Sequence, residues 1–119
     1  MQELIRQNMQ TEYREINKEL LDEIVQKILV VTQPEKIILF GSYARGDATE
    51  ESDLDLLIIQ ESNLPRHKRN TPIRLALMNI FMSKDIVVYT PEEVDEWKSA
   101  SMSFIATVLR EGKILYEKK

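Results

Sequence analysis

Residues 36–59 read KIILFGSYARGDATEESDLDLLII, and this stretch decides the fold. It begins with a short apolar run, Lys36–Phe40, and ends with a second one, Asp53–Ile59, that opens with two acids. Short continuous apolar runs are typical of buried strands. The stretch therefore predicts two buried strands, joined by a turn that carries glycine, hydroxyl and carboxylate groups.

The turn between these runs is rich in groups that suit a phosphate. The chain has three glycines, and two of them, Gly41 and Gly46, stand here. A strand that enters a helical turn presents free backbone amides, Gly41 permits a close approach, and the Ser42 hydroxyl adds a donor. A Gly-Ser pair after a strand is also common in ordinary turns. By itself this feature leaves phosphate binding and a plain turn both open.

Acidic side chains stand at the start of two predicted strands. Asp53 and Asp55 are two residues apart, so they point to one face of a strand while Leu54 points to the other. Asp85 begins the later apolar run Asp85–Tyr89. Each acid alone also fits a strand-end or turn-capping role. If the two strands are neighbours, however, all three carboxylates reach the same face.

Such a cluster is costly without a counterion. Two unit charges about 6 Å apart repel by roughly 3 kcal/mol at an effective dielectric near 20. Three pairs would cost on the order of 10 kcal/mol, which is comparable to the net stability of a domain. Hard divalent cations would remove this cost, and oxygen ligands with a phosphate-bearing substrate favour Mg²⁺, with Mn²⁺ as a substitute.

The remaining sequence alternates helical and strand patterns over what we expect to be a single domain of 119 residues. Pattern and capping signals predict an α/β (α+β) fold, a small mixed sheet with helices packed mainly on one side. The predicted parts are an N-terminal helix over about 11–33, a core over about 36–90 and C-terminal helices over about 91–112. Within them, Thr71-Pro72 opens a helix whose apolar face is Ile73, Leu77, Ile80 and Phe81.

The last third of the chain has clearer signals for where its helices begin and end. Lys84–Tyr89 is a strand candidate, and Thr90-Pro91-Glu92-Glu93 has the spacing of a capping box with proline at the first helical position. A final helix is expected to end at Gly112 in a left-handed cap, followed by a short strand over Ile114–Tyr116.

Bulk properties narrow the class of protein. The chain has no cysteine and a formal net charge of −4, so it has no thiolate site and is not built to coat DNA or RNA. Without a signal core or a long apolar run we expect no membrane association and a cytoplasmic location.

Taken together, the turn and the acids resemble a known family. Gly41-Ser42, ten intervening residues and then Asp53-Leu54-Asp55 resemble the Gly-Ser-x10-Asp-x-Asp signature of the DNA polymerase β-like nucleotidyltransferases. The fuller string is similar to the minimal nucleotidyltransferase (MNT) branch, which includes the antitoxins encoded beside HEPN-domain toxins.

The resemblance implies a role for each matched residue. Gly41 and Ser42 would hold the β- and γ-phosphates of an NTP such as ATP. Asp53 and Asp55 would ligate the metal, and Asp85 would complete the metal site and position or deprotonate the acceptor hydroxyl. These three aspartates are thus the predicted catalytic and metal-binding residues.

The function implied by the resemblance is Mg²⁺-dependent transfer of an NMP, most simply AMP from ATP, onto a hydroxyl of a partner protein. That partner would be a HEPN-type toxin, which the chain silences by AMPylation as its antitoxin, in a hetero-oligomer. Two alternatives stay open: an enzyme that modifies a small hydroxylated molecule, and a non-catalytic antitoxin that acts by binding.

Two basic features allow two interpretations each. Arg45 is a candidate nucleotide-binding residue, or it pairs with Asp47 or Glu50 and braces the loop. The cluster at residues 65–69, PRHKR, is a solvated loop or a partner or phosphate contact near the mouth of the site. The single histidine, His67, has no companion ligand nearby and is not expected to bind metal.

Overall fold

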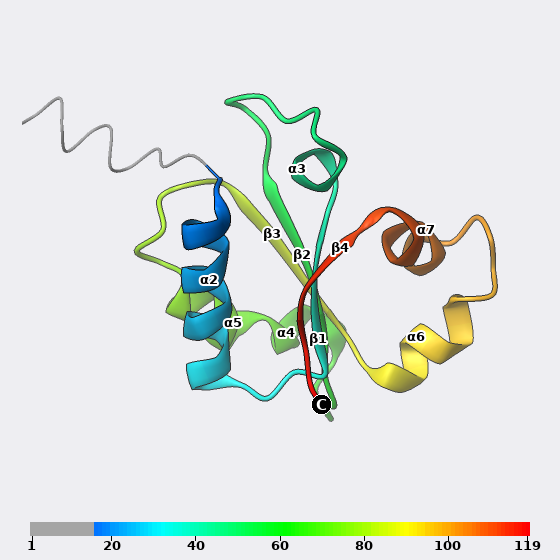
Figure 1. The fold of residues 1–119 in the computed structure, drawn as a ribbon. Coiled ribbons are helices and arrows are strands. Elements are labelled where there is room, and N and C mark those ends of the chain that lie inside the picture. The colour runs from blue at the N-terminus through cyan, green and yellow to red at the C-terminus, as the bar shows by residue number, and fades with distance from the viewer. Residues whose placement is uncertain (1–15) are drawn as a thin grey trace, which may run out of the picture.

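The computed structural model describes residues 16–119, which form a four-stranded mixed sheet flanked by helices (Figure 1). The strand order is β3-β2-β1-β4, in which β1 is antiparallel to both of its neighbours and β2 is parallel to β3. In chain order the elements are α2 (Lys18–Val31), β1 (Lys36–Phe40), α3 (Ser42–Arg45), β2 (Leu54–Ile59), α4 (Arg66–Arg69), α5 (Thr71–Ala76), β3 (Lys84–Tyr89), α6 (Pro91–Trp97), α7 (Phe104–Glu111) and β4 (Lys113–Glu117).

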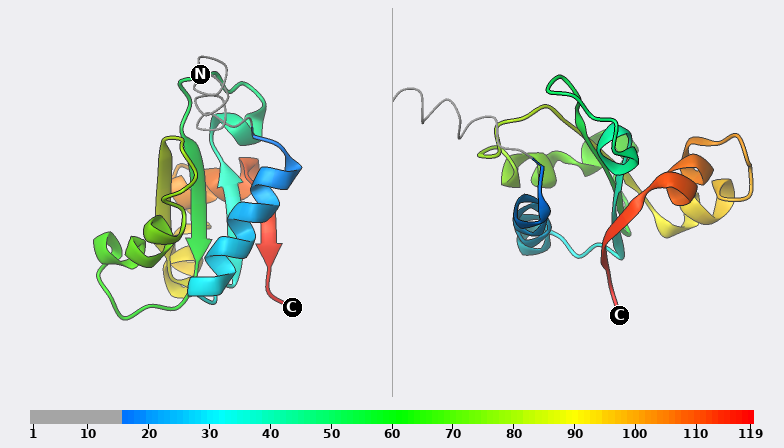
Figure 2. Two further views of the ribbon diagram at one scale, coloured as in Figure 1. Left: turned by 90° about the vertical axis from the view of Figure 1, so that its left-hand side faces the viewer. Right: turned by 45° about the horizontal axis from the view of Figure 1, so that its top comes forward.

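Alternation along β2 divides the core between the two faces of the sheet. Leu54, Leu56 and Ile58 face α2 and α5, whereas Leu57 and Ile59 face α6 and α7. We call these sides the α2 face and the α7 face. The larger buried cluster lies on the α2 face, and a smaller one lies under α6 and α7. Helices α2 and α5 lie on one side of the sheet, and α6 and α7 lie on the other (Figures 1 and 2). The predicted mixed sheet is confirmed. Helices pack on both of its faces, and the buried cluster under them is larger on the α2 face than on the α7 face.

Helix α2 starts later than the predicted N-terminal helix. Asn17 has an extended backbone, and its side chain accepts a hydrogen bond from the Leu20 amide at 2.8 Å. An asparagine cap of this kind begins a helix, so the apolar residue before it, Ile16, lies outside the helix. The predicted start at residues 11–15 lies outside the described residues. The helix ends at Val31, two residues before the predicted boundary.

Helix α5 is shorter than the apolar pattern predicted. It ends at Ala76, and Asn70, rather than Thr71, occupies its N-cap position. Ile73, Leu77 and Ile80 are buried as predicted, but the Phe81 side chain is exposed because the chain has already left the helix.

The capping box of α6 is confirmed, since the Thr90 hydroxyl accepts from the Glu93 amide and the Glu93 carboxylate accepts from the Thr90 amide. Gly112 does cap α7, but in an extended conformation and not a left-handed one. Glycine is needed there for space, because a Cβ would stand 2.5 Å from Ile38 Cγ2 and 2.6 Å from the Val108 carbonyl oxygen. The predicted last strand is confirmed as β4.

Candidate active site

The Gly-Ser turn connects the end of β1 to the one-turn helix α3. Gly41 has a φ of 76°, and its carbonyl accepts from the Ala44 and Arg45 amides at 3.1 and 3.0 Å. Gly46, with a φ of 88°, ends the turn in the left-handed region. Because the leading amides of a helix have no intrahelical partner, α3 presents donors just after Gly41.

Two separate features of the structure require glycine at position 41. Its positive φ disfavours any residue with a side chain. In addition, a Cβ at this position would overlap Oδ2 of Asp55, which lies against the glycine. The turn and the acid of β2 are therefore in direct contact, which joins the two halves of the sequence motif in space.

The three predicted acids come together at one end of the α7 face. Asp55 and Asp85 are register partners in the parallel pair of β2 and β3, so their Cα atoms are about one strand spacing, ~4.8 Å, apart. Asp53 precedes Asp55 by two residues and lies at the same edge. Asp55 is half-buried, whereas Asp53 and Asp85 are exposed.

The electrostatics of this edge are unfavourable to a full set of carboxylates. Burial raises the pKa of Asp55, and the neighbouring charges of Asp85 and Asp53 raise it further, while Arg45 lowers it. A carboxylate whose pKa is raised by like charges is stabilised by a bound cation. The edge thus combines oxygen ligands with an excess of negative charge.

The three aspartates fit a divalent metal by the type of ligand atom that they offer. Aspartate oxygens are the ligands that Mg²⁺ prefers, and two of the three acids are fixed by strand register. As placed, the acidic side chains of residues 16–119 do not form a closed set of three or more ligands.

Arg45 adopts the bracing arrangement. Its Nε lies 3.3 Å from Asp47 Oδ2, and both side chains are about half-exposed or more. Exposed pairs of this kind contribute about 0–1 kcal/mol, so the guanidinium is free to exchange partners at little cost. Its charge also opposes the rise in the pKa of Asp55.

The basic cluster lies at the other end of the sheet, which corrects the interpretation that it stands near the site mouth. Arg69 donates to the Val88 carbonyl, and Arg66 stacks over the Tyr89 ring at 4.1 Å. Because β3 runs from Asp85 to Tyr89, the two ends are separated by roughly 13 Å along the strand.

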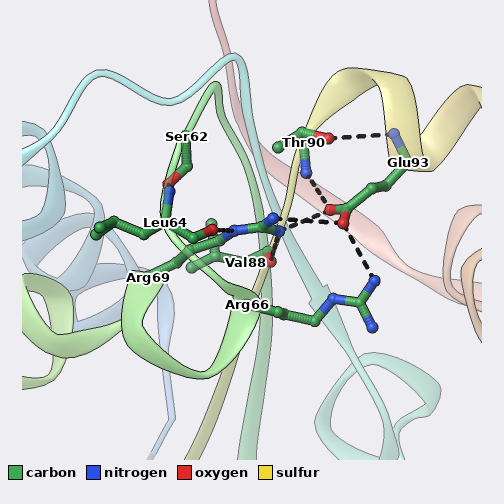
Figure 3. Close-up of polar contacts among 7 residues, drawn as sticks. All are labelled: Ser62, Leu64, Arg66, Arg69, Val88, Thr90 and Glu93. Carbon is green, nitrogen blue, oxygen red and sulfur yellow. Dashed lines mark hydrogen bonds and ion pairs between the residues drawn. The ribbon is translucent and has the colours of Figure 1, made fainter.

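Two of the four cationic side chains in the cluster serve structure (Figure 3). Arg69 and Arg66 pair with the Glu93 carboxylate at 2.7 and 3.2 Å. These bonds, with the one from Thr90, hold the pKa of Glu93 at about 2. Sequence reasoning identified Glu93 as a cap residue and missed this second role, because ion pairing across 24 and 27 residues leaves no local pattern.

No helix in the described part of the chain is long and apolar enough to cross a bilayer.

Comparison with known proteins places this site in a family. The family model "Polymerase beta, Nucleotidyltransferase" matches residues 19–119. A protein of Methanocaldococcus jannaschii, provisionally named a protein adenylyltransferase, is 41% identical over 83 residues, which are 68% of this chain and 77% of that protein. A second protein of the same organism with the same name is 36% identical over 72 residues, 59% of this chain and 72% of its own.

Solved structures show the same fold. A toxin–antitoxin structure with AMP-PNP has a TM-score of 0.61 at 20% identity, covering 83% of this chain and 74% of that one. A complex of a tri-AMPylated Shewanella oneidensis HEPN toxin with an MNT antitoxin has a TM-score of 0.55 at 19% identity, covering 86% and 74%.

The family match and the two relatives confirm the resemblance of the sequence to the polymerase β-like nucleotidyltransferases. The chain belongs to the polymerase β nucleotidyltransferase family and is a nucleotidyltransferase.

Proposed function

We propose that this enzyme transfers AMP from ATP, with Mg²⁺, onto a hydroxyl of a partner protein, and that the partner is a HEPN-type toxin that the chain silences as its antitoxin. The observation that carries the chemistry is the contact of Gly41 with Asp55, whose register partner is Asp85. It joins a phosphate-binding turn to an acid cluster within one strand spacing.

The turn provides the anchor for the leaving group. The leading amides of α3 and the Ser42 hydroxyl donate to the β- and γ-phosphates, and Arg45 leaves Asp47 to add a charge-assisted bond. The absence of a side chain at Gly41 lets the phosphates approach the backbone closely. With the polyphosphate held here, the α-phosphorus lies over the acids.

The acids organise the reacting centre. Asp53 and Asp55 are the residues that would hold Mg²⁺, which supplies charge neutralisation to the triphosphate when bound. Asp85 stands on the edge strand β3, on the far side of Asp55 from the turn, and we expect the acceptor hydroxyl to approach from this edge.

The bond changes balance simply. The acceptor oxygen forms a bond to the α-phosphorus as the bond between that phosphorus and the α,β-bridging oxygen breaks. Pyrophosphate leaves toward Gly41 and Ser42, and the acceptor proton passes to the Asp85 carboxylate. Catalysis then consists of positioning and charge stabilisation.

The choice of a protein acceptor is supported by the relatives. The two similar M. jannaschii proteins bear the name protein adenylyltransferase, and the fold recurs beside an AMPylated HEPN toxin. The chain's net charge of −4 suits a protein or small-molecule acceptor better than a nucleic acid.

The test is to incubate the purified chain with Mg²⁺, each NTP in turn and a co-expressed HEPN-type partner, followed by intact-mass spectrometry. We expect one or more AMP units on the partner, absent with Asp53→Asn and retained with the exposed control Lys68→Ala. Tight complex formation without mass gain for any NTP would instead identify a binding antitoxin. Transfer only to small hydroxylated compounds would reject the protein acceptor.

A further inference from the structure

A row of aromatic rings begins beside the acids on the α7 face. Phe40 is the register partner of Asp55 in the antiparallel pair of β1 and β2, and it is half-buried. Its ring packs edge-on against Phe104, with 5.3 Å between centroids and an interplanar angle of 81°. The Phe104 ring in turn lies 6.0 Å from that of Tyr89. Phe104 therefore bridges the end of β1 and the end of β3.

The far end of this row is anchored. The Arg66 guanidinium stacks on Tyr89 at 4.1 Å and is tied to Glu93 at 3.2 Å. In the middle of the row, Phe104 is the first residue of α7, directly after the N-cap Ser103, whose side chain accepts from the Ala106 amide at 3.0 Å. The cap fixes the start of the helix that carries Phe104, and the Phe104 ring contacts a ring on each side.

Although it is held in place, Phe104 is 42% exposed. The residues of α7 that fill the core are Ile105, Ala106 and Val108, so burial does not account for the aromatic residue. A single exposed apolar side chain needs no explanation. Phe104 differs because its neighbours fix the ring and because it adjoins the reacting centre.

The position of the ring relative to the acids indicates what it contacts. The Cα atoms of Asp55 and Phe40 are one strand spacing, about 4.8 Å, apart. The ring centroids of Phe40 and Phe104 are 5.3 Å apart. This is within the reach of one nucleoside whose α-phosphate lies at the acids. The row also runs along the sheet, away from the line between the Gly41 turn and Asp85 that the leaving group and acceptor occupy.

We propose that the exposed surface of Phe104 is the stacking platform for the base of the incoming NTP, which makes Phe104 a substrate-binding residue of this enzyme. The inference rests on the proposed function only in that the site takes an NTP. An aromatic platform without hydrogen-bonding partners binds every base, and binds the larger purines best, because stacking depends on overlapping area. The class of ligand is therefore a purine nucleoside triphosphate.

The experiment separates the base from the phosphates by using two probes in the absence of an acceptor. Equilibrium binding of ATP and of inorganic tripolyphosphate, each with Mg²⁺, is measured by calorimetry for the wild type, Phe104→Ala and Phe104→Trp. We expect Phe104→Ala to weaken ATP binding roughly tenfold and to leave tripolyphosphate binding unchanged. Phe104→Trp should restore ATP binding, and CTP should be affected less than ATP.

A matched control comes from the same helix. Leu109 is 39% exposed, lies on α7 five residues after Phe104 and is not one of the rings of the aromatic row, so Leu109→Ala should leave both affinities unchanged. If Phe104→Ala does not fold, Phe104→Leu keeps an apolar side chain of similar bulk and removes the ring, and it should show the same selective loss for ATP.

Three outcomes would overturn the inference. Unchanged ATP affinity in Phe104→Ala would show that the ring does not contact the base. Equal loss of ATP and tripolyphosphate binding would mean that the substitution acts through the acid edge. Absence of ATP binding in the wild type would remove both this inference and the proposed function, whereas ATP binding without transfer to any acceptor would reject the proposed function and leave the stacking platform standing.

Discussion

The two ends of the α7 face differ in whether their carboxylates are paired with opposite charges. At one end, burial raises the pKa of Asp55, and the like charges of Asp85 and Asp53 beside it raise that pKa further. At the other end, Glu93 lies between Arg66 and Arg69, and its pKa is held at about 2. At the first end the like charges of Asp53 and Asp85 outweigh the opposing charge of Arg45, whereas the Glu93 carboxylate at the second end is paired with two arginines. Charges left uncompensated by the fold mark the site of function, and compensated ones mark structure.

The largest expected effect is at the uncompensated end. Asp55→Asn should reduce nucleotidyl transfer on the order of 10³-fold or more, because it removes a metal ligand at the reacting centre. The same change should leave the melting temperature equal or higher, since at neutral pH the native state carries a carboxylate whose charge is disfavoured. Parallel assays of transfer and thermal unfolding check both parts.

Metal addition sharpens the same contrast. Mg²⁺ or Mn²⁺ should raise the melting temperature of the wild type and have no effect on Asp55→Asn. A variant that keeps full transfer, or that still responds to metal, would remove Asp55 from the metal site.

The second largest effect on transfer is expected for a substitution in the turn beside Asp55. Gly41→Ala should cost roughly 1–3 kcal/mol in unfolding free energy, because alanine is strained at a φ of 76°. It should also abolish most transfer, because the added Cβ displaces the Asp55 carboxylate. Chemical denaturation and the transfer assay measure the two losses.

Gly46→Ala is the matched control for that substitution. Gly46 has a φ of 88°, but a Cβ there meets nothing within 4 Å. It should show a similar loss of stability with most transfer retained. Equal loss of transfer in both variants would mean that backbone strain, and not the contact with Asp55, explains the effect.

At the compensated end the expected effect is on stability alone. Glu93→Gln should lower the free energy of unfolding at neutral pH by about 2–3 kcal/mol, because it leaves the Arg69 guanidinium, whose side chain is 9% exposed, without its counter-charge. Transfer by the folded enzyme should be retained. Loss of transfer at full stability would place Glu93 in the active site instead.

Acid titration tests the same carboxylate without leaving an unpaired arginine at neutral pH. The pKa of Glu93 is lowered from 4.5 to about 2 in the native state, so its contribution is present above the unfolded value and is lost as the pH falls through the native value. Wild-type stability should therefore decline between about pH 5 and pH 2, and Glu93→Gln should flatten part of that decline. Parallel curves for the two proteins would contradict the assignment.

The smallest effect is expected for the part of the basic cluster that is not engaged. Lys68 is exposed, and no ion pair with it is found among residues 16–119. Lys68→Ala should change stability by less than about 0.5 kcal/mol and leave transfer unchanged. A marked loss of partner binding would revive the interpretation of residues 65–69 as a partner contact.

Sequence alone determined the features that depend on neighbouring residues. The period of two along residues 53–59 predicted a strand with Asp55 on the face opposite Leu54, and the structure contains it as β2, although Asp53 lies one residue before its start. The spacing of Thr90 and Glu93 predicted a capping box that the structure contains. The spacing of the Gly-Ser and Asp-x-Asp motifs was sufficient to identify the family. These signals are readable because the interactions behind them span only a few residues.

The tertiary structure decided what depends on contacts between distant segments. Strand register made Asp85 the partner of Asp55, the end of α5 left Phe81 exposed, and the crossing of α7 over the sheet brought Phe104 to the aromatic row. The direction of β3 carried Arg66 away from the acids and toward Glu93. Such outcomes follow from packing a whole sheet between two layers of helices, in which each residue's partner is selected by the positions of all the others. Local patterns therefore identified the candidate site residues, and only the packed fold arranged them.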